Sequence, residues 1–126
     1  MNADGVAEVA ARTGAVGFVA DVSNEADVER LFDEAWSAMG SVDVLVNNAG
    51  IIRDGMLLKK NRESGEVEAF PKAKWDQVLA VNLTGPFLCM RAFAQRLAAR
   101  EGGPGVAVNL SSISRAGNMG QGNYSA

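Results

Sequence analysis

Three groups of polar residues each follow a short apolar run of the chain. Asp21 follows residues 15–20 (AVGFVA), Asn47-Asn48-Ala49-Gly50 follow residues 42–46 (VDVLV), and Ser111-Ser112 follow residues 106–110 (VAVNL). Short apolar runs of this kind are typical of buried strands in a parallel sheet. Because parallel sheets bind ligands beyond the carboxyl ends of their strands, we expect the three groups to converge on one site.

The composition excludes several kinds of chemistry. The chain has 126 residues, a formal net charge of −3, no histidine and one cysteine, Cys89. Without histidine there is no Ser-His-Asp or Cys-His nucleophile and no His-ligated metal, and no G-x-S-x-G elbow surrounds a serine. One cysteine forms neither an internal disulfide nor a thiolate cluster, so we expect no metal.

The same composition limits the partners and the location. The mild acidity argues against nucleic-acid binding, which normally uses a basic surface. No segment has the length and apolar character of a membrane span, and the first residues do not form a signal peptide. The sequence therefore gives no indication that the protein binds a membrane. We therefore expect a cytoplasmic protein.

Helical periodicity places helices between the predicted strands. Apolar residues recur at helical spacing over residues 3–12, 25–39 and 74–100, and a kink is expected at Gly85-Pro86 inside the third helix. The polar residues 59–70 are expected to form an exposed loop or small hairpin. Strands that alternate with helices of this length predict an α/β fold with a parallel sheet.

Five motifs occur in an order that resembles the short-chain dehydrogenase/reductase family. They are Asp21-Val22, Asn47-Asn48-Ala49-Gly50, Val81-Asn82-Leu83-Thr84-Gly85, Asn109-Leu110-Ser111-Ser112 and Gln121-Gly122-Asn123-Tyr124-Ser125-Ala126. Residues 47–58 and 120–126 are most similar to 3-oxoacyl-carrier-protein reductase-like members. The resemblance implies a Rossmann-like doubly wound parallel sheet and NAD or NADP as cofactor. It also implies hydride transfer between that cofactor and a ketone or secondary alcohol, in a homodimer or homotetramer.

The resemblance assigns the cofactor to the first two motifs. Asp21 would accept a hydrogen bond from the adenine amino group, and the Val22 amide would face the ring. Asn48, Ala49 and Gly50 would lie beside the adenosine ribose, where glycine permits close approach of the backbone. Two alternatives stay open: Asp21 caps the following helix, and Asn48–Gly50 form a turn that only holds the strands. Asn47 is the more structural member.

The resemblance also assigns the catalytic residues. Tyr124, the only tyrosine, would contact the cofactor and transfer a proton to or from the substrate oxygen. Ser112 would orient that oxygen, although it lies one residue closer to Tyr124 than is commonest, and Ser111 restores the common spacing. Asn82 would hold a water in a proton relay and distort its helix, the alternative being an exposed helical asparagine.

Several parts of the family pattern lie outside these residues. The Gly-rich phosphate-binding turn would precede residue 1, and a lysine four residues after Tyr124 would follow residue 126. We therefore expect residues 1–126 to be the central part of a single NAD(P)-binding domain that lacks its first two strands and its C-terminal strands. Alone, they should be poorly stable, with exposed apolar faces, and inactive. The alternative is a non-catalytic nucleotide-binding or regulatory remnant of the same fold.

Overall fold

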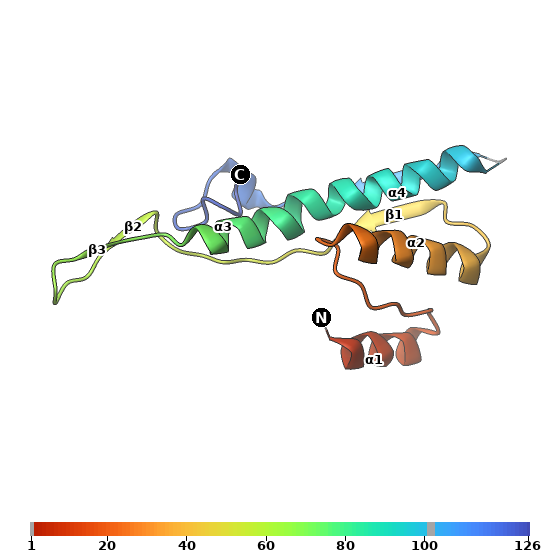
Figure 1. Cartoon of the computed structure of the whole chain (residues 1–126), viewed down its shortest axis with the longest axis horizontal. Helices are drawn as coiled ribbons and strands as arrows, with labels where there is room; N and C mark the ends of the chain where they lie inside the picture. Colours follow the sequence, from red (N-terminus) through yellow and green to blue (C-terminus); the bar gives the residue numbers. More distant parts are fainter. Residues whose placement is uncertain (1, 101–102) are drawn as a thin grey trace.

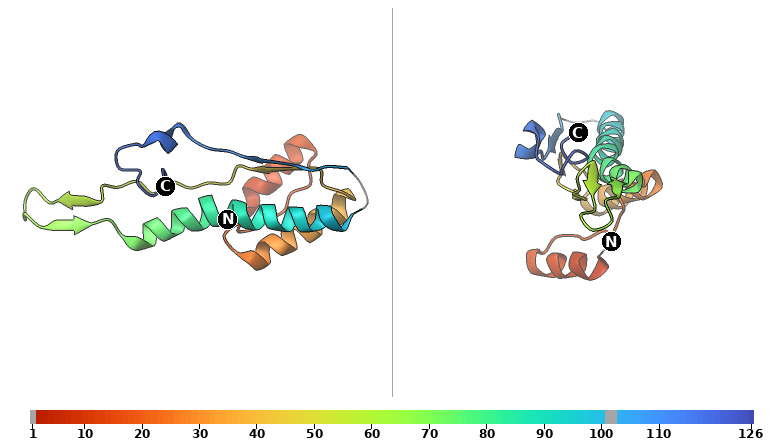
Figure 2. Two further views of the ribbon diagram at one scale, coloured as in Figure 1. Left: turned by 90° about the horizontal axis from the view of Figure 1, so that it is seen from above. Right: turned by 90° about the vertical axis from the view of Figure 1, so that its left-hand side faces the viewer.

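The computed structural model describes residues 2–100 and 103–126. A long helical rod made of α3 (Lys72–Leu79), η1 (Ala80–Thr84) and α4 (Gly85–Ala99) runs along the molecule (Figure 1). Helix α2 (Glu25–Met39) and strands β1 (Val44–Asn47) and β4 (Val106–Asn109) lie along α4, whereas β2 (Leu58–Lys60) and β3 (Val67–Ala69) project beyond α3 (Figure 2). Helix α1 (Ala3–Thr13) lies apart from the rod, on the far side of α2.

Capping residues mark the ends of the first two helices. The Asn2 side chain accepts a hydrogen bond from the Gly5 N–H, and Gly14 ends α1 with φ of 72°. Helix α2 covers the predicted residues 25–39; the Asn24 side chain accepts from the Asp27 N–H at 3.1 Å, and Gly40 follows the last turn. Both predicted helices are confirmed.

The core lies between α2 and α4. Its buried residues come from both helices: Val28, Phe32, Leu88, Cys89, Ala92 and Phe93. The Trp36 ring packs against it, 6.2 Å from the Phe32 ring and 6.1 Å from the Phe93 ring between centroids. Burial raises the pKa of the Cys89 thiol, so this cysteine stays protonated and acts as a small apolar core residue.

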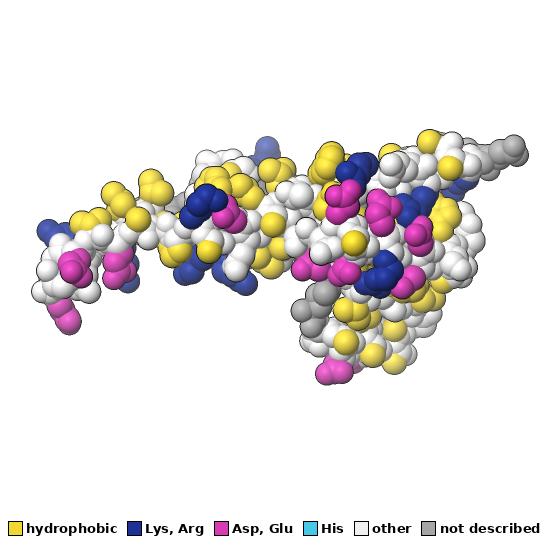
Figure 3. Space-filling model, in the orientation of Figure 1, with side chains coloured by type: hydrophobic (Ala, Val, Ile, Leu, Met, Phe, Trp, Pro, Cys, Tyr) yellow, Lys and Arg dark blue, Asp and Glu magenta, His cyan; other side chains and the backbone are white. Residues whose placement is uncertain are grey.

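Ion pairs join the same two helices at the surface. Figure 3 shows acidic and basic side chains next to one another where α2 meets α4. Arg96 on α4 lies 3.0 Å from the Glu29 carboxylate and 2.5 Å from the Asp33 carboxylate, and Arg91 pairs with Glu25. Surface pairs of this kind contribute little stability singly, so the apolar contacts beneath them hold α2 and α4 together.

The third predicted helix begins at Lys72 rather than at residue 74, and it contains the expected distortion. Residues Ala80–Thr84 form a π-helical turn, in which the Gly85 N–H donates to the carbonyl of Ala80. Pro86 follows at the start of α4 and has no N–H to donate to the preceding turn. Gly85 packs against Val22, whose Cγ2 atom would lie 2.9 Å from a Cβ placed on the glycine.

Two strands form the parallel sheet. β1 pairs with β4 in parallel, with Val44 opposite Val106 and Asn47 opposite Asn109. The predicted α/β class with an incomplete parallel sheet is thus confirmed. The prediction of a strand over residues 15–20 is wrong for this structure, since that segment joins no sheet among the described residues. No described strand lies beside it to supply ladder hydrogen bonds.

The paired strands show the exposed apolar face that was expected of residues 1–126 alone. One face carries four exposed valines, Val44 (56% exposed), Val46 (54%), Val106 (55%) and Val108 (44%). The other face packs on the helices through Leu45, which contacts the core. With two paired strands and helices on one side, nothing among the described residues covers the valines. They form an exposed apolar face of the kind expected for an incomplete sheet.

The polar stretch 59–70 forms a small hairpin, one of the two outcomes expected for it. β2 and β3 are antiparallel, with Lys59 opposite Glu68. Asn61 organises the turn by accepting a hydrogen bond from the Glu63 N–H at 2.8 Å, and Gly65 takes a φ of 76°. In the described part of the chain, no helix combines the length and the apolar character needed to cross a bilayer.

Candidate active site

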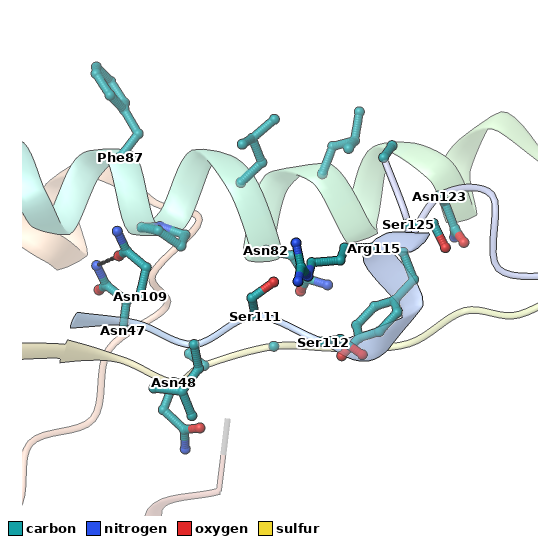
Figure 4. A pocket seen from close by; sticks show the side chains of 18 of the residues that line it. Asn47, Asn48, Asn82, Phe87, Asn109, Ser111, Ser112, Arg115, Asn123 and Ser125 are labelled. Carbon is teal, nitrogen blue, oxygen red and sulfur yellow. Dashed lines mark hydrogen bonds between the residues drawn. The ribbon is translucent and has the colours of Figure 1, made fainter. Parts of the chain in front are cut away.

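One open cavity of about 490 Å³ lies where the loops after β1 and β4 meet the π-helical turn (Figure 4). All the predicted site residues except Asp21 and Val22 line it, namely Asn48, Ala49, Gly50, Asn82, Ser112 and Tyr124. These residues come from segments far apart in the sequence. The predicted convergence of the second and third polar groups is therefore confirmed.

The strand ends are aligned by a pair of asparagines. The Asn47 amide donates to the side-chain oxygen of Asn109 at 2.8 Å, and the Asn109 amide contacts the Met90 sulfur at 3.4 Å. Because Asn47 and Asn109 face one another in the parallel register, the loops that follow them start side by side. This contact gives Asn47 the structural role that was expected of it.

Asn82 connects the π-helical turn to the loop after β1. Its Oδ1 accepts from the Ile51 N–H at 2.9 Å, and its Nδ2 donates to the Ile51 carbonyl at 2.9 Å. The side chain is half-buried, so the alternative of an exposed helical asparagine is wrong. A Cβ on Gly50 would meet only the Asn82 amide, at 3.6 Å and 3.9 Å, so the fold leaves room at this backbone position.

Both serines after β4 line the cavity. Ser112 caps the short 3-10 turn η2 (Ile113–Ala116), and its Oγ accepts from the Ser114 N–H at 3.2 Å. A hydroxyl that accepts in this way keeps its own hydrogen for donation. Figure 4 shows Ser111 and Ser112 on the segment that follows β4. The assignment of the catalytic role to Ser112 stays a prediction, with Ser111 as its alternative.

Tyr124 follows a turn whose other residues were not predicted to have individual roles. The Tyr124 N–H donates to the Gln121 carbonyl at 3.0 Å. The neighbouring Asn123 is 3% exposed and donates to the carbonyls of Arg53, at 3.0 Å, and Lys74, at 3.5 Å. Its Oδ1 is buried and has no hydrogen-bond partner among the described residues. In the sequence, Gln121 and Asn123 were noted only as members of the motif 121–126, and no individual role was predicted for either residue.

Asp21 lies outside the cavity and forms a turn with Ser23. Its Oδ1 accepts from the N–H of Ser23 at 3.0 Å and from the hydroxyl of Ser23 at 2.7 Å. These two hydrogen bonds to the charged form lower the pKa of Asp21. The Asp27 carboxylate in turn accepts from the Asp21 N–H at 2.9 Å. Asp21 therefore closes the turn that it forms with Ser23, whereas Asn24 caps α2, so the alternative in which Asp21 caps the following helix is wrong. The contact of Asp21 with adenine stays a prediction.

Val22 lines a second, apolar groove of about 240 Å³ between α2 and β1. This groove and the larger cavity share Asn47, Asn48 and Ala49 as common wall residues. The first and second motifs thus lie on adjoining surfaces, although not on one cavity. Within residues 2–100 and 103–126, no three carboxylate or cysteine side chains are placed to hold a metal ion together.

Comparison with known proteins finds one family over nearly the whole chain. The family model described as short chain dehydrogenase matches residues 2–126. A 3-oxoacyl-[acyl-carrier-protein] reductase of Synechocystis sp. is 37% identical over 123 residues, which are 96% of this chain and 45% of the relative. The reductase of that name from Staphylococcus aureus is 40% identical over 85% of this chain and 39% of its own length, and the one from Staphylococcus epidermidis is 35% identical over 99% and 48%. The chain spans less than half the length of these curated relatives.

Proposed function

Because the chain belongs to the short-chain dehydrogenase family, we propose that its cavity is part of the active site of an NAD(P)-dependent oxidoreductase. The intact enzyme would reduce a ketone or oxidise a secondary alcohol by hydride transfer. The observation that carries the proposal is the meeting of Asn82, Ser112 and Tyr124 on one cavity that the loop Asn48–Gly50 also lines.

The residues present fit part of a nicotinamide dinucleotide. The cavity lies beyond the carboxyl ends of two parallel strands, where α/β sheets bind such ligands. Gly50 leaves its backbone open, and the buried Asn123 Oδ1 lacks a partner among the described atoms. The loop Asn48–Gly50 would hold the ribose, and the bound cofactor would supply or accept the hydride.

In the reduction, Tyr124 would donate its phenolic proton to the carbonyl oxygen as negative charge develops there. The Ser112 hydroxyl would donate a hydrogen bond to the same oxygen and fix its position beside Tyr124. Asn82 would hold the relay water that returns a proton to the phenol. In the oxidation the same residues act in the reverse direction, with Tyr124 accepting the proton of the alcohol.

We propose a 3-oxoacyl thioester as the substrate class, because the similar reductases are named for 3-oxoacyl-[acyl-carrier-protein]. A homodimer or homotetramer in the cytoplasm would be the working form. Leu83 and Phe87 support such an assembly, since they are exposed apolar residues one turn apart on the helical rod, 62% and 55% exposed.

The test is an assay of the full-length gene product and its Tyr124→Phe variant, with NADPH or NADH and a 3-oxoacyl thioester of pantetheine. The wild type should oxidise the cofactor, and removal of the phenolic hydroxyl should lower kcat by about 10²- to 10⁴-fold with little change in cofactor affinity. Cofactor binding without turnover in the wild type would favour the non-catalytic nucleotide-binding alternative. Neither binding nor turnover would overturn both hypotheses.

A further inference from the structure

Two segments far apart in the sequence are joined beside the cavity by three hydrogen bonds, which we name the clasp. They are Asn123 Nδ2 to the Arg53 carbonyl at 3.0 Å, Gln121 Nε2 to the Asp54 carboxylate at 3.0 Å, and the Gly55 N–H to the Gly120 carbonyl at 2.7 Å. Gly120 adopts a left-handed backbone with φ of 78°, a conformation that glycine takes without strain. The clasp therefore fixes residues 120–123 against residues 53–55.

The clasp ends at the residue before Tyr124. The Gln121 carbonyl accepts from the N–H groups of Tyr124, at 3.0 Å, and Ser125, at 2.8 Å, so the turn from Gln121 to Ser125 is closed on itself. Asn123 is buried within that turn. Any shift of Gln121 or Asn123 would consequently carry the Tyr124 side chain with it.

The other end of the same loop holds Asn82. Ile51 makes two hydrogen bonds with the Asn82 amide, and Arg53 stands two residues later in the chain. The segment 51–55 thus contacts both the π-helical turn and the turn that carries Tyr124. It gives two residues from different elements one common support.

Resting on the proposed function, we propose that Gln121 and Asn123 are positioning residues that hold the Tyr124 hydroxyl at the reacting oxygen by binding Asp54 and the Arg53 carbonyl. Neither side chain needs to touch substrate for this role. Catalysis depends on placement to a fraction of an ångström, and a displacement of about 1 Å is enough to lower a rate about 100-fold.

Gln121→Glu is the first test variant, because it changes the clasp with little change in shape. The introduced carboxylate would still accept from Ser114 and Asn118, as the Gln121 oxygen does now, but it would face the Asp54 carboxylate without a hydrogen between them. Asp54→Asn alone keeps an oxygen that accepts from Gln121. In the double variant the new amide at position 54 can donate to the new carboxylate at position 121, which restores the bond with exchanged roles.

The experiment measures kcat and KM of the full-length enzyme per cofactor-binding site, counted by titration with NADPH. We expect Gln121→Glu to lower kcat by about 10- to 100-fold with an unchanged number of sites. Asp54→Asn and the double variant should stay within about threefold of the wild type. Gln95→Glu, the same change on the exposed face of α4, is the matched control and should leave kcat unchanged.

Each other outcome has one meaning. If Gln121→Glu loses activity only because it has fewer cofactor-binding sites, and the remaining sites have a normal kcat, the proposal is overturned. Gln121 would then be a purely structural residue. A kcat in the single variant equal to that of Gln95→Glu, or failure of the double variant to recover, would also overturn the proposal. An inactive wild type would instead reject the proposed function. Asn123→Asp, which removes the donor to Arg53, should lower kcat in the folded fraction in the same way.

Discussion

Asn82 and Ile51 bind one another through two hydrogen bonds of 2.9 Å, in which the side-chain amide pairs with both polar backbone groups of the isoleucine. The pair joins a π-helical turn to the loop that follows β1. A side chain that pairs with backbone in this manner substitutes for the missing partner of a sheet or a helix. Asn82 therefore has a structural role in addition to the proton-relay role proposed for it.

Asn82→Ala tests both roles together. It leaves the Ile51 N–H and carbonyl without partners in a half-buried position, which should lower the free energy of unfolding by about 1–3 kcal/mol. We expect kcat of the full-length enzyme to fall at least about tenfold, because the loop after β1 is no longer held in position against the π-helical turn. Thr84→Ala, an exposed position of the same turn, is the control for chemical denaturation and kinetics. Equal effects of the two substitutions would contradict the prediction.

Ser112 and Ser111 are distinguished by a pair of single variants. If Ser112 orients the substrate oxygen, Ser112→Ala should lower kcat/KM about 100-fold, whereas Ser111→Ala should change it by less than about threefold. The loss of the cap on η2 is a second effect of Ser112→Ala. Ser112→Thr retains the hydroxyl for the cap and should be less impaired. The reverse order of the two alanine variants would assign the role to Ser111.

The sequence predicted the elements whose signals are local. The helices over residues 3–12 and 25–39 and the distortion near Gly85-Pro86 depend on neighbouring residues alone, so the pattern of residues was enough to predict them. The strand expected over residues 15–20 failed because a strand exists only with a partner. No described strand pairs with that segment, although its composition favours one.

The residues of the candidate site that stand in motifs could be predicted from the sequence, whereas the contacts between its loops could not. Asn82, Ser112 and Tyr124 stand in recognisable motifs, and parallel strand ends bring their loops together. The contacts of Gln121 and Asn123 with residues 53–55 were not predictable, because they depend on how two loops approach in space. A periodic or spacing signal carries no information on such pairing.

The predicted contact of Asp21 with adenine can be tested separately from its hydrogen bonds with Ser23. Asp21→Ala removes both hydrogen bonds with Ser23 and any contact with adenine, whereas Ser23→Ala removes only the bond from the Ser23 hydroxyl and keeps the one from the backbone N–H. If Asp21 binds the adenine amino group, only Asp21→Ala should weaken cofactor binding, by about five- to tenfold, as measured by fluorescence titration. If the two variants bind equally well, the role of Asp21 is confined to the loop.

The stabilisation that the Asp21–Ser23 hydrogen bonds provide should also depend on pH. Hydrogen bonds from Ser23 lower the pKa of Asp21 below its ordinary 3.8, so the folded state favours the carboxylate. A lowered pKa stabilises the fold at pH values above the unfolded pKa, and this stabilisation is lost as the pH falls through the lowered folded value. The difference in free energy of unfolding between wild type and Ser23→Ala should therefore be constant near neutrality and shrink below about pH 4. A difference that grows on acidification would contradict this assignment.

The exposed valine face determines how residues 1–126 should behave when produced alone. Val44, Val46, Val106 and Val108 form a contiguous apolar face on the β1–β4 pair, opposite the side that packs on the helices. Such faces bind the dye ANS and promote association. We expect strong ANS fluorescence, and a severalfold decrease when all four valines are replaced by threonine, which keeps the preference for strands.

The matched control makes the same change at exposed valines outside that face. Val9, Val16 and Val67 are 55%, 58% and 61% exposed, and none of them belongs to the β1–β4 pair. Their joint replacement by threonine removes a similar kind of surface without altering the sheet face, so most of the ANS fluorescence should remain. An equal decrease in the two variants would show that the dye binds elsewhere, and the valine face would then not be the apolar surface that governs association of residues 1–126.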